Sequence, residues 1–497
     1  MPSTQSFQRR VLLMTNSEYG QANSIIAIAH ALAIQPNVEV HFASFHDAES
    51  RLEELRASLQ GTDTLGLGSS LSFHDIGGIS MKEAICQLPD MANYIHGCGF
   101  WGALDSYRNL TKTLFGWKPE QYMEAVNGCV NIIKKVNPHA IVIDNLLCQG
   151  VDACRQIGKK YISAGPLSLK DITMELQPRS LLNYPMMSTA YPFPLPWSKV
   201  LPNLAVGLYL GYSLFTSPGL KALNAVRHAA GLKGLPPMFQ GFQTDIEYLI
   251  PTIPEIDLAV TVIPPNITIC GPFILPVFGT IEDADPGLAI WLKAAEGRTI
   301  LVNLGTHTIA DANMTQQLAR GISSVIQHER DHGRKLQFLW KLKLSPDSEV
   351  DSILQTELGR EIKNGDVRVL GWLSIDPLAL LQGHIMCSVH HGGANSYFES
   401  ILNGIPHVIL PRWYDLYDYA QRAEYLGVRI FASKTVAPDV DSVEFANAVI
   451  RVIAPQSTYI KKAKELAHIC KAKCRGRELG AERILIAADQ SLFSEQT

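Results

Sequence analysis

Residues 390–400 read His-His-Gly-Gly-Ala-Asn-Ser-Tyr-Phe-Glu-Ser and stand between two apolar runs. This order predicts a buried strand, a tight turn and a helix that begins near Ala394. The backbone N–H groups at a helix start lack intrahelical partners, and the helix dipole adds positive charge there. Glycine also lets a ligand approach the backbone closely. We therefore predict that Gly393, Asn395 and Ser396 hold an anion such as a phosphate.

A second turn of this kind, residues 303–308, follows another apolar run and contains Gly305 and Thr306. Two turns that face one ligand suit a diphosphate, and the His391 imidazole can donate to one of its oxygens. Taken alone, each turn also fits a close strand-to-helix connection, with Asn395 as a capping residue. The combination of the two turns favours the diphosphate.

Three more side chains near these turns can bind the other parts of a nucleotide sugar. Trp372 ends a predicted strand and can stack on a flat base, although the same position suits a partly buried core aromatic. Glu399 lies one helical turn beyond Ser396, where a carboxylate accepts hydrogen bonds from ribose hydroxyls or pairs with the helix dipole. Asp415 is either a helix cap or an acceptor for sugar hydroxyls.

The sequence predicts no metal site. His390 and His391 are adjacent in a predicted extended segment and therefore point to opposite sides, whereas a zinc site needs other spacing and more ligands. Asp283 and Asp285 match the Asp-x-Asp pattern with which some sugar-transferring enzymes bind a divalent cation. They precede Pro286 and a predicted helix, so we favour a capping role.

These polar turns belong to a chain in which strand and helix patterns alternate. Strand patterns at residues 10–15, 38–45 and 140–145 are separated by helical ones, and the alternation restarts after a connector rich in Pro and Gly. Such alternation predicts parallel sheets with crossover helices. We therefore expect an α/β fold with two doubly wound halves, in which ligands bind outside the carboxyl ends of the strands.

Composition indicates a large globular protein without a nucleic-acid partner. Of the 497 residues, 46% are hydrophobic and 18% are charged, and the net charge is −4 without a polybasic run. These values exclude a disordered chain and offer no positive field for a nucleic-acid backbone. The first apolar run is shorter than a signal peptide needs, so we expect a cytoplasmic protein. Residues 204–215 are too few to span a bilayer, so we expect no integral membrane segment and interpret them as a core or pocket-lining helix. Contact of this helix with a membrane surface is the less favoured alternative.

The spacing W-x(18)-H-G-G-x-N-S-x-x-E-x(4)-G-x-P-x(8)-D, from Trp372 to Asp415, is far more specific than any of its parts. It resembles the donor-binding signature of family 1 UDP-glycosyltransferases. Details such as "LPRWYDLYDYAQRAEYLGV" resemble the fungal members most. The resemblance is strong over residues 297–430 and diffuse before them. It implies a GT-B fold, in which two Rossmann-like domains face each other across a cleft.

The resemblance also implies how the chain is divided. We expect an N-terminal acceptor-binding domain over residues 1–265 and a linker over residues 266–285. A C-terminal domain that binds the UDP-sugar is expected over residues 286–475, and a final helix over residues 476–497 is expected to return to the first domain.

Each residue that matches the family's signature inherits an expected role. Trp372, with Leu373 beside it, is expected to stack on uracil, and Glu399 to bind the ribose hydroxyls. The diphosphate is expected to contact Gly305, Thr306, His391, Gly393, Asn395 and Ser396. Asp415 matches the carboxylate that binds the sugar. The next position is a glutamine in many plant members but is Leu416 here, so one contact to the sugar is missing.

The sequence departs from the family's pattern at the catalytic base. In this family a histidine after the first strand removes the acceptor's proton and an aspartate orients it, but Gln21 stands at that position here, and an amide is not a base at neutral pH. Asp144 matches the orienting aspartate and can take the proton itself if burial raises its pKa. Glu18 and His46 lie at the same predicted sheet edge and are further candidates for the base. All three also fit structural roles, such as a helix cap.

We therefore predict an inverting transfer of a sugar, with UDP-glucose as the donor, to an oxygen or carbon of a hydrophobic phenol or polyketide. Residues 94–101 and 184–212 are expected to line the acceptor site. UDP-sugar is a co-substrate, and no metal or other cofactor is required because the two turns stabilise the leaving diphosphate. Two alternatives stay open. One is a nucleotide-sugar epimerase of the same architecture, and the other is a helper protein that has lost catalysis, since Gln21 replaces the base.

Overall fold

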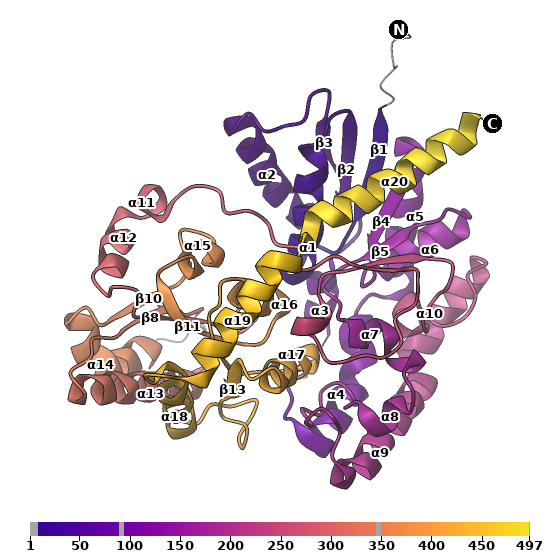
Figure 1. Cartoon of the computed structure of the whole chain (residues 1–497). Helices are drawn as coiled ribbons and strands as arrows, with labels where there is room; N and C mark the ends of the chain where they lie inside the picture. Colours follow the sequence, from indigo (N-terminus) through magenta and orange to yellow (C-terminus); the bar gives the residue numbers. More distant parts are fainter. Residues whose placement is uncertain (1–7, 89–93, 344–348, 497) are drawn as a thin grey trace.

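Two parallel β-sheets organise the chain, one in each half. The computed structural model describes residues 8–88, 94–343 and 349–496. The strand order is β3-β2-β1-β4-β5-β6-β7 in the first sheet and β10-β9-β8-β11-β12-β13 in the second, and all neighbouring strands pair in parallel. Figure 1 shows the two halves side by side, the N-terminal one in indigo and magenta and the C-terminal one mainly in orange. The predicted α/β class with two doubly wound halves is confirmed.

The strands of the first sheet are β1 (Arg9–Met14), β2 (Val38–Ser44), β3 (Ser70–Asp75), β4 (Ala140–Asp144), β5 (Ile162–Ala164), β6 (Glu247–Ile250) and β7 (Ile267–Ile269). Those of the second are β8 (Thr299–Asn303), β9 (Gln337–Lys341), β10 (Val367–Leu370), β11 (Ile385–His390), β12 (His407–Ile409) and β13 (Arg429–Phe431).

The helices of the N-terminal half are α1 (Tyr19–Ala33), α2 (Glu49–Gly61), α3 (Met81–Cys86), α4 (Gly99–Leu114), α5 (Pro119–Val136), α6 (Cys148–Gln156), α7 (Leu169–Thr173), α8 (Ser180–Asn183), α9 (Trp197–Thr216) and α10 (Pro218–Ala229). The later helices are α11 (Ile281–Ala284), α12 (Pro286–Lys293), α13 (Ala312–Asp331), α14 (Glu349–Lys363), α15 (Pro377–Leu381), α16 (Ala394–Leu402), α17 (Tyr414–Tyr425), α18 (Ser442–Ile453), α19 (Thr458–Lys473) and α20 (Gly476–Gln496).

Helices cover both faces of each sheet, so the central strands consist of continuous apolar runs. All five residues of β4 and all five of β8 are buried. One hydrophobic core of the first sheet includes residues of α1 and α20, and the other includes residues of α5 and α6. Because parallel strands end at the same edge, the polar residues that follow them lie close together.

The first sheet extends beyond the predicted boundary at residue 265. Strand β7 pairs in parallel with β6, and Leu249 lies opposite Thr268. The predicted linker at 266–285 therefore begins with the last strand of the first sheet. This strand has only three residues and occupies the edge, so its sequence pattern is too short to distinguish from a connector.

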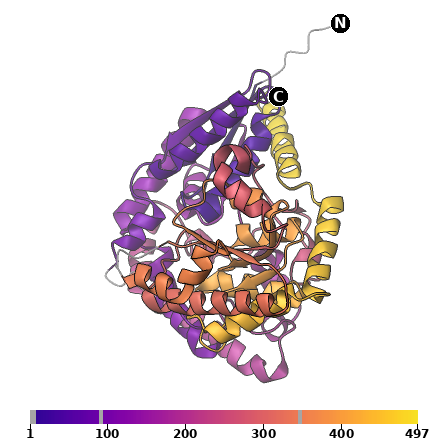
Figure 2. The same ribbon diagram turned by 90° about the vertical axis from the view of Figure 1, so that its left-hand side faces the viewer.

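The chain returns to its first half at the C-terminal end. Figures 1 and 2 show α19 along the C-terminal half and α20, in yellow, continuing over the N-terminal half. Helix α20 contacts α1, β1 and β4. Arg9 Nε donates to Asp489 Oδ1 at 2.7 Å, and Arg483 Nε donates to Glu247 Oε1 at 2.8 Å. These bonds hold α20 to the first sheet.

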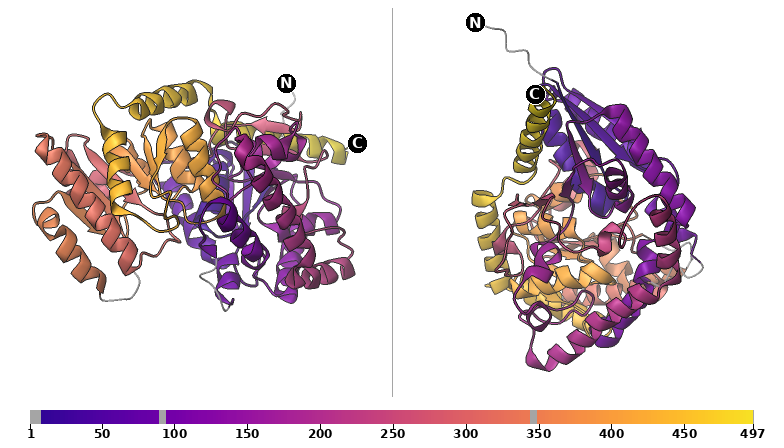
Figure 3. Two further views of the ribbon diagram at one scale, coloured as in Figure 1. Left: turned by 90° about the horizontal axis from the view of Figure 1, so that it is seen from below. Right: turned by 90° about the vertical axis from the view of Figure 1, so that its right-hand side faces the viewer.

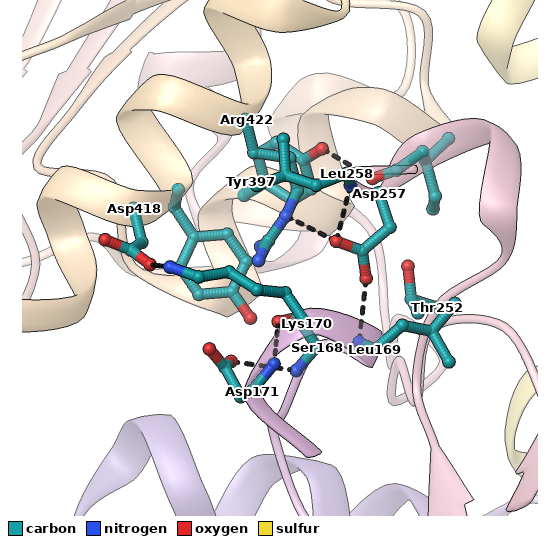
Figure 4. A network of polar contacts seen from close by, with 12 residues as sticks. Ser168, Leu169, Lys170, Asp171, Thr252, Asp257, Leu258, Tyr397, Asp418 and Arg422 are labelled. Carbon is teal, nitrogen blue, oxygen red and sulfur yellow. Dashed lines mark hydrogen bonds and ion pairs between the residues drawn. The ribbon is translucent and has the colours of Figure 1, made fainter. Parts of the chain in front are cut away.

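A buried polar network joins the two halves (Figure 4). Asp257 accepts a hydrogen bond of 3.0 Å from the main-chain N–H of Leu169 and forms an ion pair of 2.8 Å with Arg422 of α17. Lys170 of α7 pairs with Asp418, also on α17. All four charged side chains are buried, so each needs its partner. The network fixes α17, and the turn before it, relative to the N-terminal half.

The carboxyl ends of the two sheets face each other. Tyr19, at the start of α1, meets Trp372, which follows β10, with ring centroids 6.4 Å apart. In the same region the Tyr397 hydroxyl of α16 donates to Ile256 O at 2.7 Å. No helix in the described part of the chain combines the length and apolarity needed to cross a membrane.

Candidate active site

The two predicted phosphate turns meet at one imidazole. A Cβ atom built on Gly305 would lie 2.6 Å from His391 Cε1, and one on Gly393 would lie 2.7 Å from His391 Nε2. Any larger residue at either position would therefore collide with the ring. Gly305 has a φ of +83°, and its N–H donates to Asn303 Oδ1 at 3.2 Å. Thr306 follows in this turn and is partly exposed.

Helix α16 begins at this meeting point without a side-chain cap. Gly393 is its N-cap residue, and its first turn has no acidic side chain. Tyr397 N–H donates to Gly393 O at 3.0 Å, which is the first main-chain bond of the helix. The N–H groups of Ala394, Asn395 and Ser396 therefore precede the intrahelical pattern, at the positive end of the helix dipole. This arrangement suits an anion.

His391 is a neutral donor or acceptor at the same point. Burial, with His307 and Lys341 nearby, lowers the pKa of His391 to about 3. Its Nδ1 atom is buried and has no hydrogen-bond partner among the described residues. A buried ring nitrogen without a partner is costly, and a ligand oxygen placed beside it would remove that cost.

His390 instead stabilises the conformation of the turn. Its Nδ1 accepts a hydrogen bond of 3.0 Å from Gly392 N–H, and its Nε2 lies 2.8 Å from His407 Nδ1. The prediction that the two adjacent histidines face opposite sides is confirmed. His390 points into the sheet, whereas His391 points to the two glycine turns.

Trp372 belongs to a stack of alternating cations and aromatic rings that crosses between the halves. Lys341 Nζ lies 3.8 Å from the centre of the Trp372 ring, Tyr19 meets that ring edge-on, and Arg51 Cζ lies 4.2 Å from the centre of the Tyr19 ring. The Trp372 side chain is 56% exposed, which leaves room for stacking on a planar base. No pattern in the sequence indicated that Tyr19 and Arg51 would lie here, because they come from the other half.

Leu373 does not offer its side chain to this site. It is buried in a hydrophobic core with Leu301 and Leu339, beneath the turn that carries Trp372. The expected contact of Leu373 with UDP is thereby restricted to its main chain and stays a prediction. An apolar residue at a strand end is drawn into the core, where it contributes burial energy.

Glu399 lies on α16, one turn beyond the helix start. It is partly exposed, and desolvation by the surrounding protein, with Asp376 nearby, raises its pKa to about 8. A carboxyl that is protonated at neutral pH both donates and accepts hydrogen bonds. Glu399 is therefore chemically suited to ribose hydroxyls, which also do both.

Asp415 lies in the first turn of α17, directly behind the glycine turn. A Cβ atom built on Gly392 would lie 2.8 Å from Leu416 O, so the two turns are in close contact. Surrounding protein, together with Asp171 and Asp418, raises the pKa of Asp415 to about 7. Its side chain still reaches solvent, and it can exchange hydrogen bonds with a sugar next to the diphosphate.

His96 stabilises the turn that precedes α17, and the sequence analysis did not identify it. Tyr414 N–H donates to His96 Nε2 at 2.9 Å, and His96 N–H donates to Arg412 O at 3.1 Å. The Tyr417 hydroxyl donates to His96 O at 2.5 Å. Burial lowers the pKa of His96 to about 4, which keeps Nε2 available as an acceptor. The only signal in the sequence was a lone histidine within the predicted acceptor segment.

Asp144 ends β4 at the carboxyl edge of the first sheet and is fully buried. Thr15 Oγ1 donates to its Oδ2 at 3.1 Å, and Leu146 N–H donates to its Oδ1 at 3.0 Å. Desolvation outweighs these bonds and raises the pKa of Asp144 to about 6. A Cβ atom on Gly165 would lie 2.9 Å from Asp144 Oδ1, so only glycine leaves space for the carboxylate.

Glu18 is a second carboxyl at this edge. Its Oε1 accepts a hydrogen bond of 2.9 Å from Lys82 N–H, and its Oε2 is buried without a partner among the described residues. Burial, with smaller contributions from Asp47 and Asp144, raises the pKa of Glu18 to about 7. Both carboxyls therefore titrate near neutral pH, as a general base requires.

The other two predicted catalytic residues differ from this pair. Gln21 lies in the first turn of α1, and its Oε1 accepts a hydrogen bond of 2.8 Å from Asn16 Nδ2. His46 is 81% exposed in its side chain, and its Nδ1 lies 3.5 Å from Glu49. A catalytic role for His46 stays a prediction. The short turn after β2 directs the imidazole to solvent.

Of the segments predicted to line the acceptor site, Tyr191, Leu195 and Val200 form a small cluster of their own. Other residues of these segments pack into a larger cluster beside the turn that precedes α17. It joins residues of α4 and α9 with Met186 and with Tyr414 from the C-terminal half. The rings of Tyr94 and Trp413 meet edge-on at 5.3 Å. Trp101 and Tyr212 lie within the predicted segments but are exposed. Their rings contact Phe100 and Tyr209, which pack against the cluster, and their place in the acceptor site stays a prediction.

Metal ligands do not gather in the described part of the chain. No group of three or more His, Cys, Asp or Glu side chains there could hold a metal ion. Asp285 Oδ1 accepts a hydrogen bond of 2.8 Å from Leu288 N–H and is the N-cap of α12. The interpretation of Asp285 as a helix cap is confirmed.

Comparisons with known proteins agree with this geometry. Residues 347–484 match the family described as erythromycin biosynthesis protein CIII-like, C-terminal domain. The chain is 35% identical over 502 positions to glycosyltransferase sdnJ of Sordaria araneosa, an alignment that covers 95% of this chain and 96% of that protein. It is 24% identical over 251 positions to a UDP-glycosyltransferase of Talaromyces amestolkiae, covering 47% of this chain and 46% of that one.

Solved structures show the same fold at low sequence identity. A UDP-glucosyltransferase from Polygonum tinctorium, described as capable of glucosylating indoxyl, superposes with a TM-score of 0.63 at 15% identity, over 98% of this chain and 99% of that one. The glycosyltransferase of kitacinnamycin superposes with a TM-score of 0.62 at 14% identity, over 97% and 99% of the two chains. The fold is GT-B, and the chain belongs to the family 1 glycosyltransferases.

Proposed function

We propose that the enzyme transfers glucose from UDP-glucose, with inversion, to a hydrophobic acceptor that carries a phenol or a comparable hydroxylated ring. One observation carries the donor half of this proposal. The buried Nδ1 of His391 lacks a partner among the described residues and lies beside two glycine turns and the uncapped start of α16. A diphosphate would satisfy the ring nitrogen and the helix N–H groups together.

The exposed indole of Trp372 supports a nucleoside at one end of this diphosphate, and Glu399 supports its ribose. Asp415 lies at the other end, where the sugar would be. Two relatives are named UDP-glycosyltransferase or UDP-glucosyltransferase, which supports uridine as the nucleoside and glucose as the sugar. Leu416 stands where many plant members of the family have a glutamine, and it is buried here, so in this proposal Asp415 is the main polar contact to the sugar.

The part of the proposal that concerns the acceptor rests on the carboxyls of Asp144 and Glu18 and on the aromatic cluster. In the proposed step, a carboxylate of Asp144 or Glu18 removes the hydroxyl proton, the oxygen bonds to the anomeric carbon, and the bond from that carbon to the diphosphate breaks. An electron-rich ring carbon can attack in the same way and lose its proton afterwards. The charge that develops on the diphosphate is stabilised by the helix start and His391, so the proposal requires no metal.

The test is a coupled measurement of UDP and glycoside. Purified enzyme is incubated with UDP-glucose and a panel of phenols, and the products are analysed by mass spectrometry and NMR. We expect equimolar UDP and a β-linked glucoside. Isomerised UDP-sugar in the absence of an acceptor would instead support an epimerase. Turnover with another nucleotide sugar, such as a GDP-sugar, and none with UDP-glucose would overturn the donor assignment.

A further inference from the structure

Helix α9 has an apolar face that no other part of the described chain covers. Trp197, Leu201, Leu208, Tyr212 and Phe215 recur at intervals of four, seven, four and three residues, which places them along one side of a helix. Their exposure is between 63% and 89%. The interpretation of residues 204–215 as a core or pocket-lining helix therefore holds for only one face of α9. We name these five residues the α9 stripe.

The other face of α9 is buried against the N-terminal half. Val206 lies in the aromatic cluster, and Asn203 Nδ2 donates to Leu181 O at 2.9 Å and to Tyr184 O at 3.0 Å. Helices α4 and α8 both contact α9. Figure 1 shows α9 at the lower edge of the N-terminal half, and the view from below in Figure 3 looks onto that edge. The stripe is thus held by a rigid framework at the periphery of the molecule.

The surroundings of the stripe carry a one-sided charge. Between Glu175 and Asp245 the sequence has no acidic residue, whereas the whole chain has a net charge of −4. The segment contains five cationic side chains, namely Arg179, Lys199, Lys221, Arg227 and Lys233. Arg227 is buried and pairs with Asp152, and the other four are exposed. This concentration of positive charge is therefore free to meet an anionic partner.

One of these cations lies at the C-terminal end of the stripe, where Lys221 Nζ is 5.8 Å from the centre of the exposed Phe215 ring. Lys199 lies on the opposite side of α9, and its Nζ is 5.3 Å from the centre of the Tyr191 ring. The neighbouring helix α4 has one acidic residue, Asp105, which pairs with Arg108 at 3.2 Å. An apolar stripe with large aromatic residues and a flanking lysine has the properties of a helix that lies in a membrane interface.

We propose that α9 docks the protein onto an anionic lipid bilayer, with the stripe in the headgroup and acyl boundary and Lys221 against lipid phosphates. Anionic headgroups match the acid-free surroundings, which a purely apolar protein contact would not require. This docking is peripheral, in agreement with the finding that no described helix is suited to cross a membrane. It does not depend on the identity of the donor or acceptor, so it can fail or succeed independently of the proposed function.

Vesicle flotation tests the proposal with the full chain. The vesicles are phosphatidylcholine alone or phosphatidylcholine with about 30% phosphatidylserine, at moderate salt. We expect the protein to float with the anionic vesicles and to bind the neutral ones more weakly. The variant Leu201→Glu/Leu208→Glu should bind at least about tenfold more weakly, because two apolar contacts become charged. Lys221→Glu should weaken the preference for anionic vesicles.

A matched control separates the stripe from general hydrophobicity. Leu67→Glu/Ile290→Glu also introduces two charges at strongly exposed apolar positions, but outside α9, and should float like the wild type. Far-ultraviolet circular dichroism and thermal unfolding establish that each variant is folded. Wild-type protein that stays in solution with anionic vesicles would overturn the proposal, as would equal binding by the α9 variant. A dimer that requires the stripe and excludes vesicle binding would identify a second copy as the occupant instead.

Discussion

The main-chain N–H of Tyr414 donates a hydrogen bond of 2.9 Å to Nε2 of His96, and this bond connects the two halves of the enzyme. Tyr414 has a φ of 26°, in the left-handed region that a tyrosine rarely adopts. His96 therefore stabilises a strained turn that carries Asp415 at its next position. One side chain in this way positions both the segment of the predicted acceptor site and the turn that carries Asp415.

Replacing His96 should impair turnover more than nucleotide binding. In His96→Ala the buried Tyr414 N–H loses its acceptor, at a cost of about 1–3 kcal/mol, and the turn before α17 relaxes. A displacement of this kind next to the reacting atoms lowers kcat by roughly 10- to 100-fold. Calorimetry should give an unchanged Kd for UDP, because the glycine turns remain intact. His332→Gln, at an exposed histidine, is the control and should leave both quantities unchanged.

Asp144 and Glu399 should separate catalysis from donor binding. Asp144→Asn preserves the shape of the buried side chain but removes the base, so we expect kcat to fall by roughly 100- to 10,000-fold with little change in UDP affinity. Glu399→Ala removes the carboxyl on α16 and should weaken UDP binding by roughly tenfold. Steady-state kinetics and calorimetry measure the two effects. An equal loss of UDP affinity in both variants would contradict the assigned roles.

The pH dependence of kcat/KM should distinguish the two carboxyls. A general base works only when deprotonated, so activity should rise with pH through the pKa of the base and level off above it. The pKa is about 6 for Asp144 and about 7 for Glu18. If Asp144 is the base, Glu18→Gln stays active and its acidic limb moves to lower pH, because a neighbouring negative charge is removed. An inactive Glu18→Gln beside an active Asp144→Asn would assign the base to Glu18.

The ion pair between Arg422 and Asp257 should matter for stability. Both side chains are almost completely buried, so Arg422→Met leaves an unpaired carboxylate in the interior. We expect a loss of about 3–5 kcal/mol in unfolding free energy. The control is Arg475→Met, which removes an exposed partner of Glu482 and should cost at most about 0.5 kcal/mol. Urea unfolding provides both values, and similar midpoints for the two variants would contradict the prediction.

Local patterns in the sequence were sufficient for the strands, the glycine turns and the family. The run that forms β11, followed by Gly392 and Gly393, specifies a buried strand and a turn without reference to distant residues. The same applies to the cap at Asp285, since a capping side chain acts within three residues. The position of Asp144 at a strand end also followed from its own segment.

Tertiary structure alone decided which of these residues meet and what their environment does to them. Tyr19 and Trp372, or His96 and Tyr414, are more than 300 positions apart in sequence, so no local pattern relates them. The elevated pKa of Glu18 arises from burial, which depends on packing from several elements. The remaining differences from the sequence-based predictions concern which side chains are exposed and which are buried. His46 and one face of α9 are directed to solvent, and Leu373 is directed into the core, because side-chain direction follows from how the elements pack.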